Sequence, residues 1–76
     1  MLHPRIVSDP AIMSGKPVIR GTRITVEHLL RKIAGGMTDE EILADHPRLD
    51  VADVRAAVSF AADYLADETI VFAEAA

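Results

Sequence analysis

Basic side chains gather in one short stretch of the chain, residues 15–26, which contains no acidic residue. Three of the eight basic residues lie in it, namely Lys16, Arg20 and Arg23. Guanidinium and ammonium groups bind carboxylates and phosphates through charge-assisted hydrogen bonds, so this stretch is the first candidate for a binding surface. Gly15 and Gly21 permit the positive φ of a tight turn, and Pro17 suits the start of an edge strand. The stretch therefore predicts a short strand, a turn and a second extended segment that present the cations on a rigid frame.

The other residue types that carry out catalysis or ligate metals are scattered. His3, His28 and His46 fall in different expected elements, and no pair of them has the spacing of a metal-binding helix motif. The acidic run at residues 39–41 falls where a helix is expected to begin, and capping and the helix dipole favour carboxylates there. The glycines have neither Walker nor dinucleotide-binding spacing. We therefore expect no enzymatic activity, no cofactor, no metal and no small-molecule ligand.

Charge is distributed unevenly along the 76 residues, whose net charge is −4. Residues 1–36 carry six basic and two acidic side chains, whereas residues 37–76 carry two basic and ten acidic ones. This asymmetry indicates two surfaces with different partners, although charge also keeps a small domain in solution.

The size and composition of the chain favour association with a second chain. Half of its residues are hydrophobic, and so small a domain buries only about 60% of the surface of its unfolded chain. It contains no cysteine and no apolar run of the roughly 20 residues that span a membrane. We expect a cytoplasmic homodimer or hetero-oligomer without membrane contact.

The residue pattern predicts a single domain, residues 1–76, made of three parts. The parts are an extended or β-hairpin arm over residues 1–24, a three-helix bundle over residues 25–67, and a tail over residues 68–76. In the arm we expect a strand at residues 6–7, and in the tail a short strand or docking segment at residues 69–72, because both runs are apolar.

Capping residues predict where the three helices begin. Thr25 opens the first helix, which should end at the pair Gly35 and Gly36. Thr38 and Glu41 form a capping box for the second helix, and Asp50 opens the third. On the third helix one broad arc contains Val54, Ala57, Val58, Ala61, Tyr64 and Leu65. Phe60 lies at its border, where we expect it to join the domain's own core, the alternative being that a partner covers it.

Two segments carry a resemblance to a known family. They are IVSDPAIMSGKPVIRGTRITV, residues 6–26, and AGGMTDEEILADHPRLDVADVRAAVSFAADYL, residues 34–65. Together they resemble the bacterial family called domain of unknown function 433, whose members are commonly described as VapB-like antitoxins. The resemblance implies a helix-turn-helix domain encoded beside a PIN-like nuclease. The expected fold class is mainly α: a three-helix, homeodomain-like helix-turn-helix bundle with a short N-terminal β-hairpin or extended arm.

The leading hypothesis is an antitoxin that neutralises a PIN-like ribonuclease toxin. The resemblance implies a toxin active site lined by carboxylates, with which an inserted arginine would pair in place of the metal ion. The expected toxin contacts are Lys16, Arg20, Arg23 and Phe60. Local pairing of the two arginines with Asp9 or Glu27 is the alternative. Other VapB-type antitoxins inhibit through a C-terminal extension, whereas the tail here is short, acidic and without arginine.

A second hypothesis, compatible with the first, is a helix-turn-helix regulator that binds DNA. Its expected DNA contacts are Arg31, Lys32, Arg48, Arg55 and Ser59. Only Arg55 is basic in the first half of the third helix, which would enter the major groove, and Asp53 there would repel phosphate. A third hypothesis is a dimeric scaffold that buries the third helix and the tail against a second copy.

Overall fold

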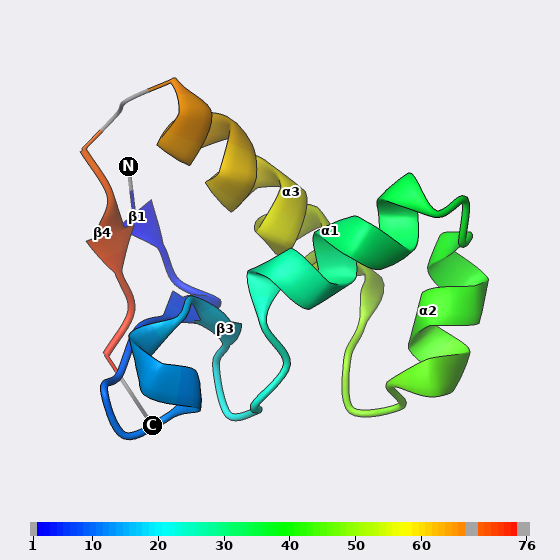
Figure 1. Cartoon of the computed structure of the whole chain (residues 1–76), viewed down its shortest axis with the longest axis horizontal. Helices are drawn as coiled ribbons and strands as arrows, with labels where there is room; N and C mark the ends of the chain where they lie inside the picture. Colours follow the sequence, from blue (N-terminus) through cyan, green and yellow to red (C-terminus); the bar gives the residue numbers. More distant parts are fainter. Residues whose placement is uncertain (1, 67–68, 75–76) are drawn as a thin grey trace.

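The structure, a computed structural model, describes residues 2–66 and 69–74 (Figure 1). Its helices are α1 (Val26–Ala34), α2 (Asp39–Asp45), α3 (Val51–Leu65) and the 3-10 turn η1 (Met13–Gly15). Its strands are β1 (Leu2–His3), β2 (Ile6–Val7), β3 (Val18–Ile19) and β4 (Val71–Phe72). The chain thus combines three α-helices with a small set of strands, as the sequence predicted.

The strands form two separate pairs. β2 and β3 pair antiparallel, with Ile6 opposite Ile19. β1 and β4 pair in parallel, with Leu2 opposite Val71, and lie side by side at one end of the molecule (Figure 1). The predicted strand at residues 6–7 and the predicted strand in the tail are both confirmed.

Side-chain caps fix the beginnings of the helices. The Thr25 hydroxyl accepts a hydrogen bond from the His28 amide at 3.0 Å. Thr38 and Glu41 form the reciprocal capping box, with bonds of 3.2 and 2.9 Å. Asp50 caps α3 in the same way. The three predicted helix starts are confirmed, because each depends on residues within one turn of the helix end.

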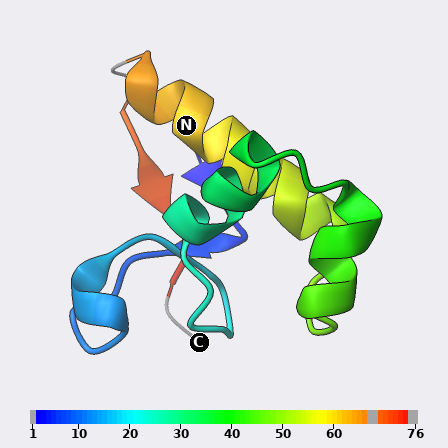
Figure 2. The same cartoon turned by 45° about the vertical axis from the view of Figure 1, so that its right-hand side comes forward.

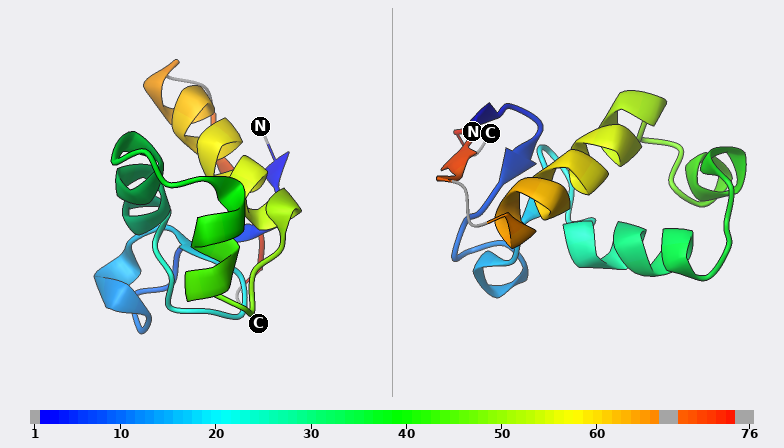
Figure 3. Two further views of the ribbon diagram at one scale, coloured as in Figure 1. Left: turned by 90° about the vertical axis from the view of Figure 1, so that its right-hand side faces the viewer. Right: turned by 90° about the horizontal axis from the view of Figure 1, so that it is seen from above.

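The core lies between the antiparallel strand pair, α1 and α3, and it extends to Ile42 of α2, which lies at the opposite end of the molecule from the strands (Figures 2 and 3). Its central residues are Ile6, Ile19, Val26, Leu29, Ile42, Leu49, Val54, Ala57 and Phe60. The Cα radius of gyration is 11.7 Å, close to the roughly 11.4 Å expected for a compact domain of this length. No helix of the described ranges combines the length and the apolar character needed to cross a membrane.

The buried face of α3 differs from the predicted arc. Phe60 is only 4% exposed, which confirms its expected place in the core. Val58, Tyr64 and Leu65 are instead 41%, 67% and 84% exposed. The prediction was wrong for these three residues because the core is centred on the Val54–Ala57–Phe60 side of the helix. The rest of the predicted arc is buried at Val54 and Ala57 and half-buried at Ala61.

Candidate functional site

A tight turn, residues 19–24, presents two arginines and is called here the Gly21 turn. Gly21 has a φ of +79°, as the sequence predicted. The Thr22 amide and hydroxyl both donate to the Ile19 carbonyl, at 3.0 and 2.8 Å. The Ile24 amide in turn donates to the Thr22 hydroxyl at 3.0 Å, and the Ile19 amide donates to the Ile24 carbonyl at 2.9 Å. This closed set of bonds gives the turn one defined shape.

Two further hydrogen bonds fasten the Gly21 turn to the rest of the domain. The Arg20 amide donates to the Arg5 carbonyl, next to β2, at 2.8 Å. The guanidinium of Arg48, in the loop between α2 and α3, donates to the Gly21 carbonyl at 3.1 Å. The exposed side chains of Arg20 and Arg23 therefore start from a backbone that is held on two sides.

The basic side chains fall into an engaged set and a free pair. Within the part of the chain that the structure describes, the side chains of Arg20 and Arg23 have neither an ion pair nor a hydrogen bond. The alternative that they pair with Asp9 or Glu27 is therefore not realised among these residues. The other six cations are engaged, as follows: Arg5 with Asp50 and Asp53, Lys16 and Arg31 with Glu27, Lys32 with Asp45, Arg55 with Asp39, and Arg48 with the Gly21 carbonyl.

The residues predicted to contact DNA belong to this engaged set, apart from Ser59, which is exposed on α3. Arg31 lies 3.1 Å from Glu27, and its hydrogen bond, helped by the charge of Lys16, lowers the pKa of that carboxyl. Lys32 donates to Asp45 at 2.7 Å and lowers the pKa of Asp45 in the same manner. These pairs neutralise cations that phosphate contacts would require.

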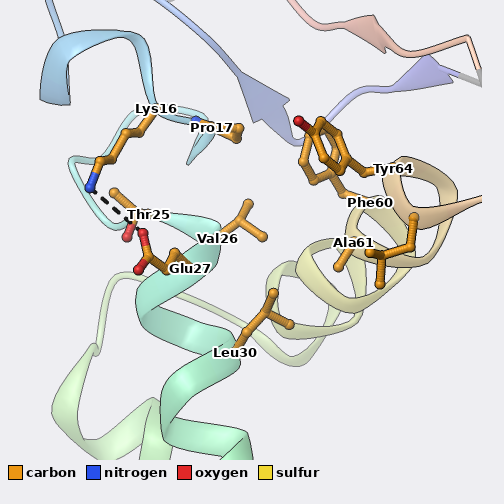
Figure 4. Close-up of a pocket in the computed structure, with 10 residues that line it drawn as sticks. Lys16, Pro17, Thr25, Val26, Glu27, Leu30, Phe60, Ala61 and Tyr64 are labelled. Atoms are coloured by element: carbon orange, nitrogen blue, oxygen red, sulfur yellow. Dashed lines mark ion pairs between the residues drawn. The ribbon is translucent and has the colours of Figure 1, made fainter. Parts of the chain in front are cut away.

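An apolar groove of about 370 Å³ opens between the start of α1 and the second half of α3 (Figure 4). Val26 and Leu30 line it from α1, and Ala61 and Tyr64 line it from α3. At its rim Lys16 pairs with Glu27 at 3.6 Å. Phe60 also lines the groove, although its burial makes it part of the wall rather than a projecting contact. A predicted toxin contact through Phe60 is thus restricted to the ring surface that the groove leaves open.

A second, more polar pocket of about 300 Å³ lies on the Gly21 turn. It is lined by Val7, Ile12, Gly21, Thr22, Arg23 and Arg48. It brings together Arg23, which the sequence analysis predicted to contact the toxin, and Arg48, which it predicted to contact DNA. Arg48 comes from the acidic part of the sequence, so no local pattern indicated that it would join the Gly21 turn.

Two contacts near the N-terminus were missed in the sequence. His3 is buried, with its Nε2 at 2.8 Å from Asp63 and its ring at 5.3 Å from that of Phe60. Arg5 bonds to Asp53 at 2.9 Å, and this bond, together with the charge of Asp50, raises the pKa of Arg5. The Asp-x-x-Asp pattern at residues 50–53 is a capping-box signal. It marks the position of the two carboxylates but not the arginine that meets them.

The fold also brings two histidines together that the sequence placed apart. The rings of His28 and His46 lie 5.5 Å apart in an edge-to-face arrangement. The His46 Nε2 is buried without a hydrogen-bond partner in the described ranges, and burial lowers the pKa of His46. In those ranges no three histidine, cysteine or acidic side chains converge as metal ligands would.

Comparison with known proteins adds a family. The family described as protein of unknown function, DUF433, matches residues 6–61. The uncharacterized protein y4eO of Sinorhizobium fredii is 38% identical over 56 residues, which are 74% of this chain and 25% of that protein. The crystal structure of a DUF433 member protein from Anabaena variabilis matches with a TM-score of 0.78 at 31% identity. That match covers 84% of this chain and 63% of the other.

The extent of these matches bears on the candidate surfaces. This chain spans about a quarter of the length of the curated relative. The residues matched by the family include the whole Gly21 turn, Arg48 and Phe60, whereas Tyr64 and Leu65 lie beyond them. The turn therefore belongs to the part of the chain that the family shares, and the outer end of the groove does not.

Proposed function

The chain belongs to the DUF433 family, and on that premise we propose that it is an antitoxin-like protein-binding module that neutralises a PIN-like ribonuclease. The observation that carries the proposal is the pair Arg20 and Arg23. Both are exposed, both stand on the hydrogen-bonded Gly21 turn, and neither guanidinium has a partner in the described part of the chain. Because neither arginine is paired among the described residues, both charges are available for a partner's carboxylates. Because the turn already has a defined shape, its backbone loses little conformational entropy on binding.

The proposed inhibition is a competition between arginine and metal. The family resemblance implies that a PIN-like active site holds its divalent ion with several carboxylates. An arginine can form two parallel hydrogen bonds to one carboxylate, and its charge then replaces that of the ion. Inhibition of this kind should weaken as the concentration of Mn²⁺ or Mg²⁺ is raised.

The exposed apolar groove supports a protein partner. Tyr64 and Leu65 at its outer end are among the most exposed large hydrophobic side chains of the described ranges. Exposed apolar patches with a charged rim are typical of surfaces that bind other proteins. Arg20 and Arg23 would then supply charge specificity, and the groove would supply apolar contact area.

Co-expression with the nuclease encoded by the neighbouring open reading frame tests the proposal. The complex would be measured by size exclusion with light scattering, and RNA cleavage by the nuclease would be measured with and without this chain. We expect a stable inhibitory complex that is lost in the double variant Arg20→Gln plus Arg23→Gln. The matched control, Arg31→Gln plus Arg55→Gln, removes the same charge from cations that are already paired.

Each outcome has a definite meaning. Loss of the complex in the first double variant alone supports inhibition through the Gly21 turn. A complex that survives this change contradicts that inhibitory surface and moves the contact to α3 or the tail. Failure of the unaltered chain to form any complex contradicts the antitoxin function.

DNA binding through a helix-turn-helix has less support as a second function. Arg31, Lys32 and Arg55 each form an ion pair, and α3 begins with the acidic pair Asp50 and Asp53. Operator binding would require these cations to exchange carboxylates for phosphates. Self-association is the remaining alternative and would appear as a thermal midpoint that rises with concentration.

A further inference from the structure

We propose that Arg23 and Arg48 form a pocket for one carboxylate group of an acidic side chain that a protein partner supplies. The pocket is the one of about 300 Å³ that lies between the Gly21 turn and the loop joining α2 to α3. The inference rests on the proposed function in one respect, because it takes the partner to be a protein. It extends that function by assigning Arg48, which the sequence suggested for DNA, to protein recognition.

The charges lining the pocket are unbalanced. Its lining residues include two arginines and no acidic residue. The Arg23 guanidinium has no partner among the described residues, and Arg48 uses one N–H to reach the Gly21 carbonyl at 3.1 Å. A guanidinium has five N–H donors, so most of the donors of this pair remain available. A bound anion would satisfy them and would screen the two positive charges from each other.

The backbone of the Gly21 turn places these two groups around one space. Arg23 follows Gly21 by two residues, and the bond from Arg48 ends on the carbonyl of Gly21 itself. The positive φ of Gly21 allows the chain to reverse here, and no atom outside Gly21 and its two chain neighbours lies within 4 Å of the position a Cβ would take. One guanidinium of the pocket is therefore held by a side-chain hydrogen bond to the turn, and the other starts from the backbone of that same turn.

One wall of the pocket is apolar. Val7 is 1% exposed and belongs to β2, and Ile12 is partly buried in the segment that follows. Apolar surroundings lower the local dielectric constant and strengthen a charge-assisted hydrogen bond. They also suit the methylene groups of a glutamate or aspartate and an apolar neighbour of that residue. A carboxylate on a peptide fits this mixed lining.

The surroundings favour a peptide over a nucleic acid. Binding to a phosphate backbone requires several available cations along a track. Apart from Arg20, Arg23 and Arg48, the basic side chains of the described ranges are held in ion pairs. This local setting fits a single acidic group better than a polyanion.

The test uses the complete chain and three probes in nuclear magnetic resonance titrations. The probes are the dipeptide N-acetyl-glutamyl-leucinamide, its uncharged counterpart N-acetyl-glutaminyl-leucinamide, and inorganic phosphate. The guanidinium Nε–Hε signals of Arg23 and Arg48 are followed, with those of Arg31 and Arg55 as internal controls. We expect the glutamyl peptide to shift the first two signals saturably, and the glutaminyl peptide to leave them unchanged.

Two variants show whether both arginines are needed. Arg23→Gln removes a side chain without a partner, so the fold should be unaffected, and we expect peptide binding to weaken about tenfold or more. Arg48→Gln removes the charge, and its side chain, which is two atoms shorter, also gives up the bond to the Gly21 carbonyl, so the same loss is expected. The Gly21 amide signal reports whether the turn is intact in each variant.

Several results would overturn the pocket. One is that the glutaminyl peptide shifts the Arg23 and Arg48 signals as much as the glutamyl peptide does, and another is that the Arg31 and Arg55 signals shift equally. The others are that Arg23→Gln binds the glutamyl peptide as tightly as the unaltered chain, and that phosphate binds at least as tightly as the glutamyl peptide. The titration needs no nuclease, so it is separate from the co-expression experiment. Peptide binding without a nuclease complex would retain the pocket and overturn the antitoxin function, whereas a complex without peptide binding would overturn the pocket alone.

Discussion

Replacement of Phe60 by alanine is the sharpest test of how α3 is packed. The side chain is 4% exposed and is surrounded by three rings, those of His3, Tyr64 and Phe72, with centroids at 5.3, 6.1 and 5.6 Å. Two of these rings come from the paired strands β1 and β4. The substitution should therefore weaken both the helical core and the attachment of the strands.

The expected loss is a large part of the total stability. Truncation of a buried phenylalanine to alanine lowers the free energy of unfolding by about 3–5 kcal/mol. A domain of 76 residues has a total of about 4–11 kcal/mol, taking about 0.05–0.15 kcal/mol per residue. Phe60→Leu keeps most of the apolar volume, so its loss of unfolding free energy should stay below about 1.5 kcal/mol.

Urea unfolding followed by far-ultraviolet circular dichroism measures these losses. With a slope of about 1 kcal/mol per molar urea, the midpoint of Phe60→Ala should fall by about 3–5 M, or the variant should be unfolded from the start. The matched control is Tyr64→Ala, one turn later on α3 and 67% exposed, for which we expect a loss below about 1 kcal/mol. A larger loss of unfolding free energy for Tyr64→Ala than for Phe60→Ala would contradict this packing of α3. It would indicate that the Tyr64 side of the helix is the buried one.

Three further changes probe the caps, the Gly21 turn and the buried histidine. Thr38→Ala should lower the free energy of unfolding by about 1 kcal/mol in urea, whereas Thr38→Ser should retain the cap. Gly21→Ala should lower it by about 1–2 kcal/mol through backbone strain at φ +79°, and Gly35→Ala, at φ −77°, should change it much less. Burial lowers the pKa of His46 from its usual 6.5, so the unfolded state binds more protons there and stability should fall as the pH drops through 6.5. Thermal midpoints between pH 7 and pH 5 should show a smaller fall in His46→Gln, and a rise in stability of the unaltered chain on acidification would contradict this reasoning.

Features that depend on neighbouring residues could be predicted from the sequence. The capping box of Thr38, the end of α1 at Gly35 and the positive φ at Gly21 follow from side-chain chemistry within a few residues. The exposure of Arg20 and Arg23 could be predicted for the same reason, because the turn that presents them is formed by hydrogen bonds between neighbouring residues.

Features that depend on distant pairing could not be predicted. His3 meets Asp63 across sixty residues, and Arg5 meets Asp53 across forty-eight. Both contacts follow from the position of the arm against α3, which no local pattern encodes. The same reason explains why Arg48 was assigned to DNA when it lies against the Gly21 turn. The prediction of which side of α3 is buried was wrong in part. A helix with apolar residues over a broad arc has no unique buried side until its neighbours are in place.

The parallel pairing of β1 with β4 has a consequence for the order in which the fold is completed. Leu2 lies opposite Val71, and the Ala73 amide donates to the Ile6 carbonyl at 2.9 Å, so the first and last segments of the chain meet only after nearly the whole chain has been brought together. Closing so long a loop costs more entropy than forming the local pair of β2 and β3. We therefore expect β1 and β4 to pair last during folding and to separate first when the native state opens locally.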